Sequence, residues 1–229
     1  MIIFFKNYKR TDRTLLSIQS IRYLFPEVKI SCLNLYDDSA DEYLYEFEKE
    51  LKLFKKMNVK MFFDKKKWNF KETSAQGSSN NGYYFTEGIN KIQSICKDEE
   101  KILIVDEDSF FTNGKTIQFL IDTDFDFAWA DWNCGEAPLT YPTKPSVGIN
   151  GSIIAINPKK LNNLFPIIEK KEFIEFLLGF ELYEKCLDAG FNLVKIPTRL
   201  DQNFCGDGLW TNDISIIKEQ LDKANIPYE

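Results

Sequence analysis

The chain has 229 residues, of which 44% are apolar and 28% are charged, values that exclude a disordered or fibrous protein and fit one globular domain. Its net charge is −6 and its basic residues form only one short run, at residues 65–67, which argues against a nucleic-acid partner. Because the chain contains no histidine, Ser-His-Asp and Cys-His hydrolases and histidine-ligated zinc enzymes are excluded, and any chemistry must depend on carboxylates, Lys, Tyr, Cys or a metal bound by oxygen atoms.

Short apolar runs alternate with segments of helical period in the first half of the chain, a pattern typical of a parallel sheet with crossover helices. The predicted strands are residues 1–5, 28–35, 59–64 and 101–106. The predicted helices between them are residues 12–25, 41–57 and 83–97. In the first helix Leu15, Ile18 and Ile21 share a stripe with Arg22 and Phe25, so we expect this face to lie in the core.

The second half of the chain has a looser pattern. Its predicted strands are residues 125–131, 152–157 and 191–196, and its predicted helices are residues 170–189 and 214–225. We expect the loop at 134–148 to form a lid or a wall of a binding site, because long loops inside compact domains are commonly functional. The sequence therefore predicts a single α/β domain over residues 1–229, with helices flanking a mostly parallel central sheet.

Three carboxylates, Asp106, Glu107 and Asp108, stand where the apolar run from Ile102 to Val105 ends. Ligands of open α/β sheets lie beyond the carboxyl ends of the strands, so these acids are placed at a candidate site. A cation would relieve their mutual repulsion, and ligand sets made only of oxygen favour Mg²⁺ or Mn²⁺. The alternative interpretation is a solvated strand end with an acidic turn.

Polar clusters also follow the first two predicted strands and precede the third predicted helix. Their members are Lys6, Asn7 and Arg10 after the first strand, Asp37 and Asp38 after the second, and Asn81 before the helix. The amide groups at the start of that helix could face an anion. Together with the acidic strand end, four polar clusters at one edge of a sheet favour a binding site over four independent turns.

The order of these motifs resembles that of glycosyltransferases with the GT-A fold, which transfer sugars from nucleotide-sugar donors, and the inverting family-two type is the most similar. Asp37-Asp38-Ser39 is similar to the family's Asp-Asp-Gly-Ser turn, and Asp106-Glu107-Asp108 stands at the position of its DxD motif. The resemblance implies that Asp37 or Asp38 meets the base, for which we expect uracil of a UDP-sugar. It also implies that Asp106 meets the ribose or a metal-bound water and that Asp108, with Asp106 beside it, binds Mn²⁺ or Mg²⁺. The further donor-binding residues are Lys6, Asn7, Arg10 and Asn81.

The second half of the chain carries further motifs of the same family. Asn150 is similar to the residue that lines the donor-sugar pocket, and Glu181 occupies a later acidic position of the segment that supplies the general base in inverting members. The adjacent Glu-Asp pair of that segment is missing. Asp201 and Gln202 instead resemble the Asp-Gln motif of retaining members. Both catalytic assignments stay open, and we favour inversion.

Aromatic and amide side chains in the second half suit an acceptor sugar, because aromatic rings pack on the apolar faces of sugars. Trp132, Asn133 and Trp210 are the candidates, whereas Trp129 is at least as well explained as a core residue. The family's late histidine ligand is absent, so Asp207, Asp213 or the diphosphate and water would have to replace it.

The predicted function is that of a metal-dependent, hexosyltransferase-like enzyme acting on a glycan, lipid-linked or protein acceptor, with residues 1–108 as the nucleotide-binding half and residues 109–229 as the donor-sugar and acceptor half. One alternative is a haloacid-dehalogenase-like phosphohydrolase with Asp106 as nucleophile and Asp108 as acid/base, although that motif normally follows the first strand. Another is a non-catalytic nucleotide- or glycan-binding module. The five widely spaced cysteines, the short apolar runs and an amino terminus unlike a signal peptide lead us to expect a cytoplasmic protein.

Overall fold

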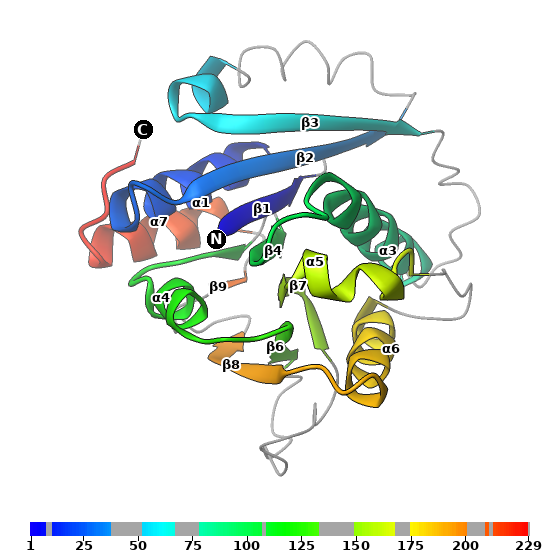
Figure 1. The fold of residues 1–229 in the computed structure, drawn as a ribbon. Helices are drawn as coiled ribbons and strands as arrows, with labels where there is room; N and C mark the ends of the chain where they lie inside the picture. Colours follow the sequence, from blue (N-terminus) through cyan, green and yellow to red (C-terminus); the bar gives the residue numbers. More distant parts are fainter. Residues whose placement is uncertain are drawn as a thin grey trace.

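A mixed β-sheet forms the centre of the protein, with helices on both of its faces (Figure 1). The computed structural model describes residues 1–7, 11–37, 52–66, 78–106, 109–132, 149–167, 175–200, 209–210 and 213–228. Within these residues the sheet has seven strands. In their order across the sheet they are β3 (Val59–Lys66), β2 (Lys29–Asp37), β1 (Ile2–Asn7), β4 (Ile102–Asp106), β7 (Ile149–Ile156), β6 (Phe127–Trp132) and β8 (Leu193–Leu200).

Strand β7 runs antiparallel to its neighbours β4 and β6, and the other neighbouring strands of the sheet are parallel, which confirms the predicted mostly parallel sheet. The end of each parallel strand and the start of β7 therefore meet along one side, which we call the carboxyl edge. It is formed by Asn7, Asp37, Lys66, Asp106, Trp132, Leu200 and Ile149. The opposite side, the amino edge, is formed by Ile2, Lys29, Val59, Ile102, Phe127, Leu193 and Ile156.

The boundary between β1 and β4 is the topological switch point of the sheet. From β1 the chain continues to β2 and β3, which lie on one side of β1 in the sheet. On the other side of β1 lies β4, and beyond it, in their order across the sheet, lie β7, β6 and β8. In open α/β sheets the connections diverge at such a point and leave a crevice beyond the carboxyl ends of the two strands.

The helices form a layer on each face of the sheet (Figure 1). One face is covered by α1 (Thr11–Leu24) and α4 (Lys115–Asp122). The other is covered by α3 (Ser78–Ile95), α5 (Pro158–Leu161), which continues into the 3-10 helix η2 (Asn162–Leu164), and α6 (Glu175–Asp188). Helix α7 (Ile214–Lys223) packs on α1 through Leu16, Ile217 and Leu221. None of the described helices combines the length and the apolar character needed to cross a bilayer.

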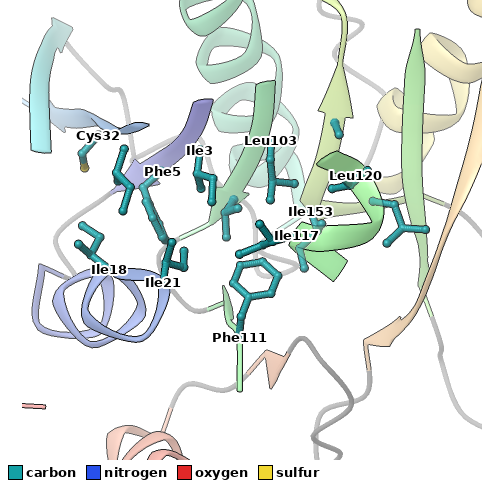
Figure 2. Close-up of a cluster of buried hydrophobic side chains, with 14 of the residues drawn as sticks. Ile3, Phe5, Ile18, Ile21, Cys32, Leu103, Phe111, Ile117, Leu120 and Ile153 are labelled. Carbon is teal, nitrogen blue, oxygen red and sulfur yellow. The ribbon is translucent and has the colours of Figure 1, made fainter. Parts of the chain in front are cut away.

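The strands beside the switch point are buried on both faces. The side chains of Ile102–Val105 are 0% exposed, because alternate residues pack under opposite helix layers. Ile3 and Phe5 of β1 lie against α1 in the cluster shown in Figure 2, and Phe4 belongs to the cluster under α3 and α6. Complete burial of one such side chain contributes roughly 1.5–3 kcal/mol, so these two clusters supply much of the stability.

The four strands predicted in the first half and its helices at 12–25 and 83–97 are confirmed, with shifts at their ends. Helix α3 begins at Ser78 rather than at residue 83, because the Ser and Asn residues that suggest a loop are also favoured where helices begin. Residues 52–56 of the helix predicted at 41–57 are described and are helical, and the loop at 134–148 lies outside the described residues. The sequence analysis did not predict α4, α5 or a two-stranded sheet of β5 (Ser109–Phe110) and β9 (Leu209–Trp210), since these elements are two to eight residues long and periodicity is recognised over longer windows.

Candidate functional site

The carboxyl edge collects the predicted site residues that lie on the strands of the large sheet. They are Lys6 and Asn7 in β1, Asp37 in β2, Asp106 in β4, Trp132 in β6 and Asn150 in β7. Asn150 reaches this edge because β7 is antiparallel, with Ile149 opposite Asp131 of β6. The five strands concerned are consecutive in the sheet, so their backbones define one continuous candidate site.

An ion pair joins the two strands at the switch point. Lys6 and Asp106 are register partners in the parallel pair β1–β4, and Lys6 Nζ lies 2.7 Å from Asp106 Oδ1. Their side chains are 7% and 18% exposed. Both residues continue the alternation of Phe4 and Ile104, which places them on the sheet face covered by α3. At this distance the pair is a charge-assisted hydrogen bond that balances the first carboxylate of the acidic run.

The other face of the carboxyl edge holds a buried amide network. Asn7 Nδ2 donates to Asn34 Oδ1 at 2.8 Å, and Asn7 Oδ1 accepts from Thr14 Oγ1 of α1 at 3.2 Å. Asn34 Nδ2 donates in turn to the carbonyl of Phe62 in β3, at 3.2 Å. Asn7 as a whole residue is 1% exposed, and its side chain joins the end of β1 to β2 and to α1.

A further contact fixes the residue that follows the acidic run. Ser17 Oγ of α1 donates to the carbonyl of Ser109 at 2.8 Å, and these two residues are 1% and 0% exposed. In the small sheet Ser109 is the register partner of Trp210, so this predicted acceptor residue is brought next to the residue that follows the acidic run. The sequence analysis did not single out Ser17. The feature that could have indicated it is a small polar residue between the apolar residues Leu16 and Ile18 of the first helix.

The donor chemistry of the edge suits a hard cation, although the described residues supply only part of a ligand set. Asp106 offers carboxylate oxygens at the strand end, one of which holds Lys6. Within the described part of the chain no three His, Cys, Asp or Glu side chains are grouped closely enough to hold a metal ion. Asp213 is the N-cap residue of α7, and its Oδ1 accepts from the Ser215 hydroxyl at 2.6 Å and from the Ser215 amide at 2.8 Å, which lowers the pKa of Asp213 below its ordinary value.

The remaining predicted residues fall into three groups. Asn81 lies in the first turn of α3, and Glu181 lies six residues after Glu175 in α6, about 9 Å along the helix axis at 1.5 Å per residue. Trp129 is a core residue, 2% exposed, with its ring edge-to-face against Tyr183 at 4.9 Å between centroids. The predicted residues outside the described part of the chain are Arg10, Asp38, Asp108, Asn133, Asp201, Gln202 and Asp207.

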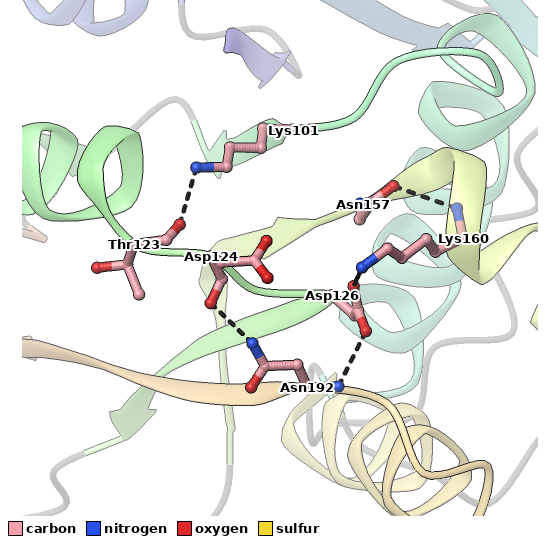
Figure 3. Close-up of polar contacts among 7 residues, drawn as sticks. All are labelled: Lys101, Thr123, Asp124, Asp126, Asn157, Lys160 and Asn192. Carbon is pink, nitrogen blue, oxygen red and sulfur yellow. Dashed lines mark hydrogen bonds and ion pairs between the residues drawn. The ribbon is translucent and has the colours of Figure 1, made fainter.

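A separate polar network lies at the amino edge (Figure 3). Asp126, which is 5% exposed, accepts from the Asn192 amide at 2.9 Å and forms an ion pair of 2.7 Å with Lys160. The hydrogen bond and the charge of Asp126 raise the pKa of Lys160. Lys101 Nζ donates to the carbonyls of Leu120, Ile121 and Thr123 at the end of α4. These contacts join the starts of β4, β6 and β8 to neighbouring helices, so we assign this network a structural role.

A groove of about 370 Å³ also opens near the amino edge, with Ile2, Phe4, Phe62 and Cys96 among its lining residues. None of the residues that line it is a predicted site residue. Burial raises the pKa of the Cys96 thiol to about 11, so this sulfur is protonated and unreactive at neutral pH. The groove is therefore separate from the candidate site at the carboxyl edge.

No family model and no curated protein sequence match the chain. Solved structures do share its fold. The galactosyltransferase LgtC in complex with donor and acceptor sugar analogs has a TM-score of 0.54 and 11% identity, over 98% of this chain and 95% of LgtC. The inositol-1-phosphate CTP transferase from T. maritima has a TM-score of 0.53 and 10% identity, over 100% and 97%.

A third similar structure is the mannosyltransferase PcManGT from Pyrobaculum calidifontis in complex with GDP-Man and Mn²⁺. Its TM-score is 0.52 and its identity 10%, over 100% of this chain and 64% of PcManGT. The chain therefore has a GT-A-like fold, as its motif order predicted.

Proposed function

We propose that the chain is a glycosyltransferase that moves a sugar from a nucleotide diphosphate-sugar to a hydroxyl group of an acceptor. The observation that carries this proposal is the gathering of Lys6, Asp37 and Asp106 at the carboxyl edge around the switch point, where open α/β sheets bind ligands. The shared fold with a galactosyltransferase and a mannosyltransferase supports it. In this proposal residues 1–108 bind the nucleotide, and residues 109–229 hold the donor sugar and the acceptor.

The nucleotide would bind across the ends of β1 and β2. Asp37 or Asp38, with the backbone of residues 6–10, would recognise the base, for which we propose uracil. Arg10 and the first turn of α3, which contains Asn81, would face the phosphates, because helix amide groups attract anions. Asn7 would act by holding these strand ends in place through its bonds to Asn34 and Thr14.

Asp106 and Asp108 would hold Mn²⁺ or Mg²⁺, which when bound supplies the positive charge that stabilises a departing diphosphate. The two acids are two residues apart at the end of a strand, so their side chains are expected on the same face, with Glu107 on the opposite one. Asp106 would also position the ribose. Lys6, 2.7 Å from Asp106, adds a fixed cation beside the phosphates.

Glu181 would act as the general base in an inverting reaction, removing the proton from the acceptor hydroxyl as its oxygen attacks the anomeric carbon. Helix α6 covers the same sheet face on which Lys6 and Asp106 lie, which supports this choice. Asn150 would contact the donor sugar. The proposed acceptor contacts are Trp132, Asn133 and Trp210. If the product retains the anomeric configuration, Asp201 and Gln202 are the residues to test.

Nucleotidyl transfer is the second candidate, because the CTP transferase from T. maritima has the same fold. The same acids would then bind a nucleoside triphosphate, a phosphate group of an acceptor would attack its α-phosphorus, and the bond to pyrophosphate would break. A haloacid-dehalogenase-like phosphohydrolase is not favoured, since Asp106 ends the fourth of the described strands rather than the first.

The test is an assay of the full chain with UDP-sugars, GDP-sugars and CTP in the presence of Mn²⁺, in which release of nucleoside diphosphate and of pyrophosphate is followed separately. We expect slow, metal-dependent release of nucleoside diphosphate that an acceptor accelerates. Asp108→Asn should abolish it, and Glu181→Gln should lower turnover by roughly 100-fold while donor binding survives. Asp98→Asn, at an exposed position between α3 and β4, is the control that loses one carboxylate elsewhere.

Release of pyrophosphate from CTP, with the nucleotide-sugars left intact, would instead assign nucleotidyl transfer. Unchanged binding of metal and nucleotide by Asp108→Asn would remove the acidic strand end from the site and contradict the proposal.

A further inference from the structure

The Lys6–Asp106 ion pair places a cation on the carboxylate that is expected to help hold the metal. Lys6 Nζ lies 2.7 Å from Asp106 Oδ1, and the lysine side chain is 7% exposed. An ammonium group this well buried needs a nearby negative charge, because the free energy of removing it from water is otherwise not offset. In the absence of a nucleotide, Asp106 supplies that charge.

This arrangement gives Lys6 opposite effects on the two proposed ligands of the site. Its positive charge repels a divalent cation that approaches Asp106, and it competes for one of the two carboxylate oxygens. The same charge attracts a diphosphate. At 18% exposure the Asp106 side chain is partly shielded from water, so solvent screens these effects less than it would at an open surface.

We propose that Lys6 makes metal binding depend on the nucleotide diphosphate, a regulation of the site that rests on the proposed function. Without a diphosphate, the Lys6 ammonium group stays paired with the Asp106 carboxylate, and the divalent cation binds weakly. When a diphosphate enters, its oxygens provide the ammonium group with a further anionic partner, and Asp106 becomes available to the cation. By linkage, the factor by which the diphosphate raises the affinity for the metal equals the factor by which the metal raises the affinity for the diphosphate.

The position of the pair supports this inference. Lys6 and Asp106 are register partners on adjacent strands, so both groups remain at the switch point while their partners change. The ends of β1 and β2 beneath them are fixed by the bonds of Asn7 and Asn34 on the opposite face. An exchange of partners therefore needs only side-chain rotation, without a change in the sheet.

The experiment measures the binding of Mn²⁺ alone and of UDP alone, by calorimetry, to the full chain and to Lys6→Met. We expect Lys6→Met to bind Mn²⁺ roughly tenfold more tightly in the absence of nucleotide, and to bind UDP in EDTA roughly tenfold more weakly, within the usual range of coupling factors. Lys6→Arg should resemble the parent in both titrations. Lys60→Met removes the same charge from an exposed position in β3 and should change neither affinity.

A double variant locates the effect. Adding Asp106→Asn to Lys6→Met should remove the gain in Mn²⁺ affinity, because the carboxylate released by the first substitution is then absent. If Lys6→Met does not fold, Lys6→Gln, which keeps a hydrogen-bond donor without the charge, takes its place in the same titrations.

An unchanged or weaker affinity for Mn²⁺ in a folded neutral variant at position 6 would overturn the inference and leave Lys6 a purely structural role. The absence of measurable Mn²⁺ binding to both the parent and the neutral variant would overturn it as well. The titration with Mn²⁺ alone contains no nucleotide and no turnover, so its outcome is distinct from that of the glycosyltransferase assay, which can fail while the titration succeeds.

Discussion

Arg22 of α1 ties together three parts of the chain at the amino edge, and its removal should lower stability without weakening nucleotide binding. Its Nε donates to the carbonyl of Met57 at 3.0 Å, and Nη2 donates to that of Asn58 at 3.1 Å. Nη1 donates to the carbonyls of Pro26, at 3.1 Å, and Val28. One guanidinium thus joins the end of α1 to the segments that lead into β2 and β3.

The expected loss of unfolding free energy depends on which of these hydrogen bonds are shielded from water. The bonds to Met57 and Val28 are part-buried, and losing a hydrogen bond to a charged group costs about 1.5 kcal/mol at the lower end of the measured range. The carbonyls of Pro26 and Asn58 are exposed, so water can replace the guanidinium there. Arg22→Met, which keeps most of the aliphatic stem, should therefore lower the free energy of unfolding by about 3 kcal/mol. For a domain of this size, the melting temperature would fall by roughly 6–12 °C.

Urea unfolding followed by far-UV circular dichroism measures this difference, and Arg22→Lys is the informative companion. Lysine keeps the charge but lacks the planar fork of donors, so it should recover only part of the loss. Below its unfolding transition Arg22→Met should bind UDP as the parent does, because the contacts lie at the edge opposite the candidate site. Stability within 0.5 kcal/mol of the parent would refute this account of the amino edge.

Two further predictions concern helix ends. Gly114→Ala should destabilise the protein by about 2 kcal/mol, because residue 114 has a φ of 73° and an added Cβ would lie 2.5 Å from the Phe25 ring. Gly190→Ala is the comparison, because residue 190 has the same φ but no atom lies within 4 Å of the added Cβ. It should lower the free energy of unfolding by about 1 kcal/mol in the same urea assay. Equal losses would contradict the role of the Phe25 contact. The bonds from Ser215 hold the pKa of Asp213 below its unfolded value of about 3.9, so the contribution of this carboxylate is present above that pH and is lost as the pH falls through the folded pKa. The difference in melting temperature between the parent and Asp213→Ala should therefore shrink between pH 7 and pH 2.5, and a difference independent of pH would contradict this reasoning.

The sequence was sufficient to predict the mostly parallel sheet and to place polar residues at its carboxyl edge, because both depend on local patterns. Parallel strands buried on both faces have continuous apolar runs, and Ile102–Val105 is such a run. The rule that ligands lie beyond the carboxyl ends of strands then placed Lys6 and Asp106 at the same edge. Their direct contact was not predictable, since it depends on the neighbouring positions of β1 and β4, which are 100 residues apart in the chain.

Other contacts depend on tertiary packing that no local pattern records. Arg22 lies on the apolar stripe of α1, which predicted a core position, but its guanidinium reaches the backbone at the amino edge. Asp126 falls within the strand predicted at residues 125–131, whereas it lies just before β6 and is buried against Lys160 and the Asn192 amide. The antiparallel direction of β7, which brings Asn150 to the carboxyl edge, also follows from the arrangement of the whole sheet.

The charged side chains at the two edges of the sheet have different partners. This difference bears on function independently of the resemblance to glycosyltransferases. At the amino edge, Arg22 and Lys101 bind backbone carbonyls where helices end and strands begin, so their charges stabilise the fold. Lys6 and Asp106 bind each other at positions where β1 and β4 have just passed through Phe5 and Val105, both 0% exposed. An apolar pair there would extend the core, and replacing a buried ion pair by apolar residues is often neutral or stabilising. Stability therefore does not account for two charges at the switch point, whereas the proposed binding of an anionic ligand and a cation would.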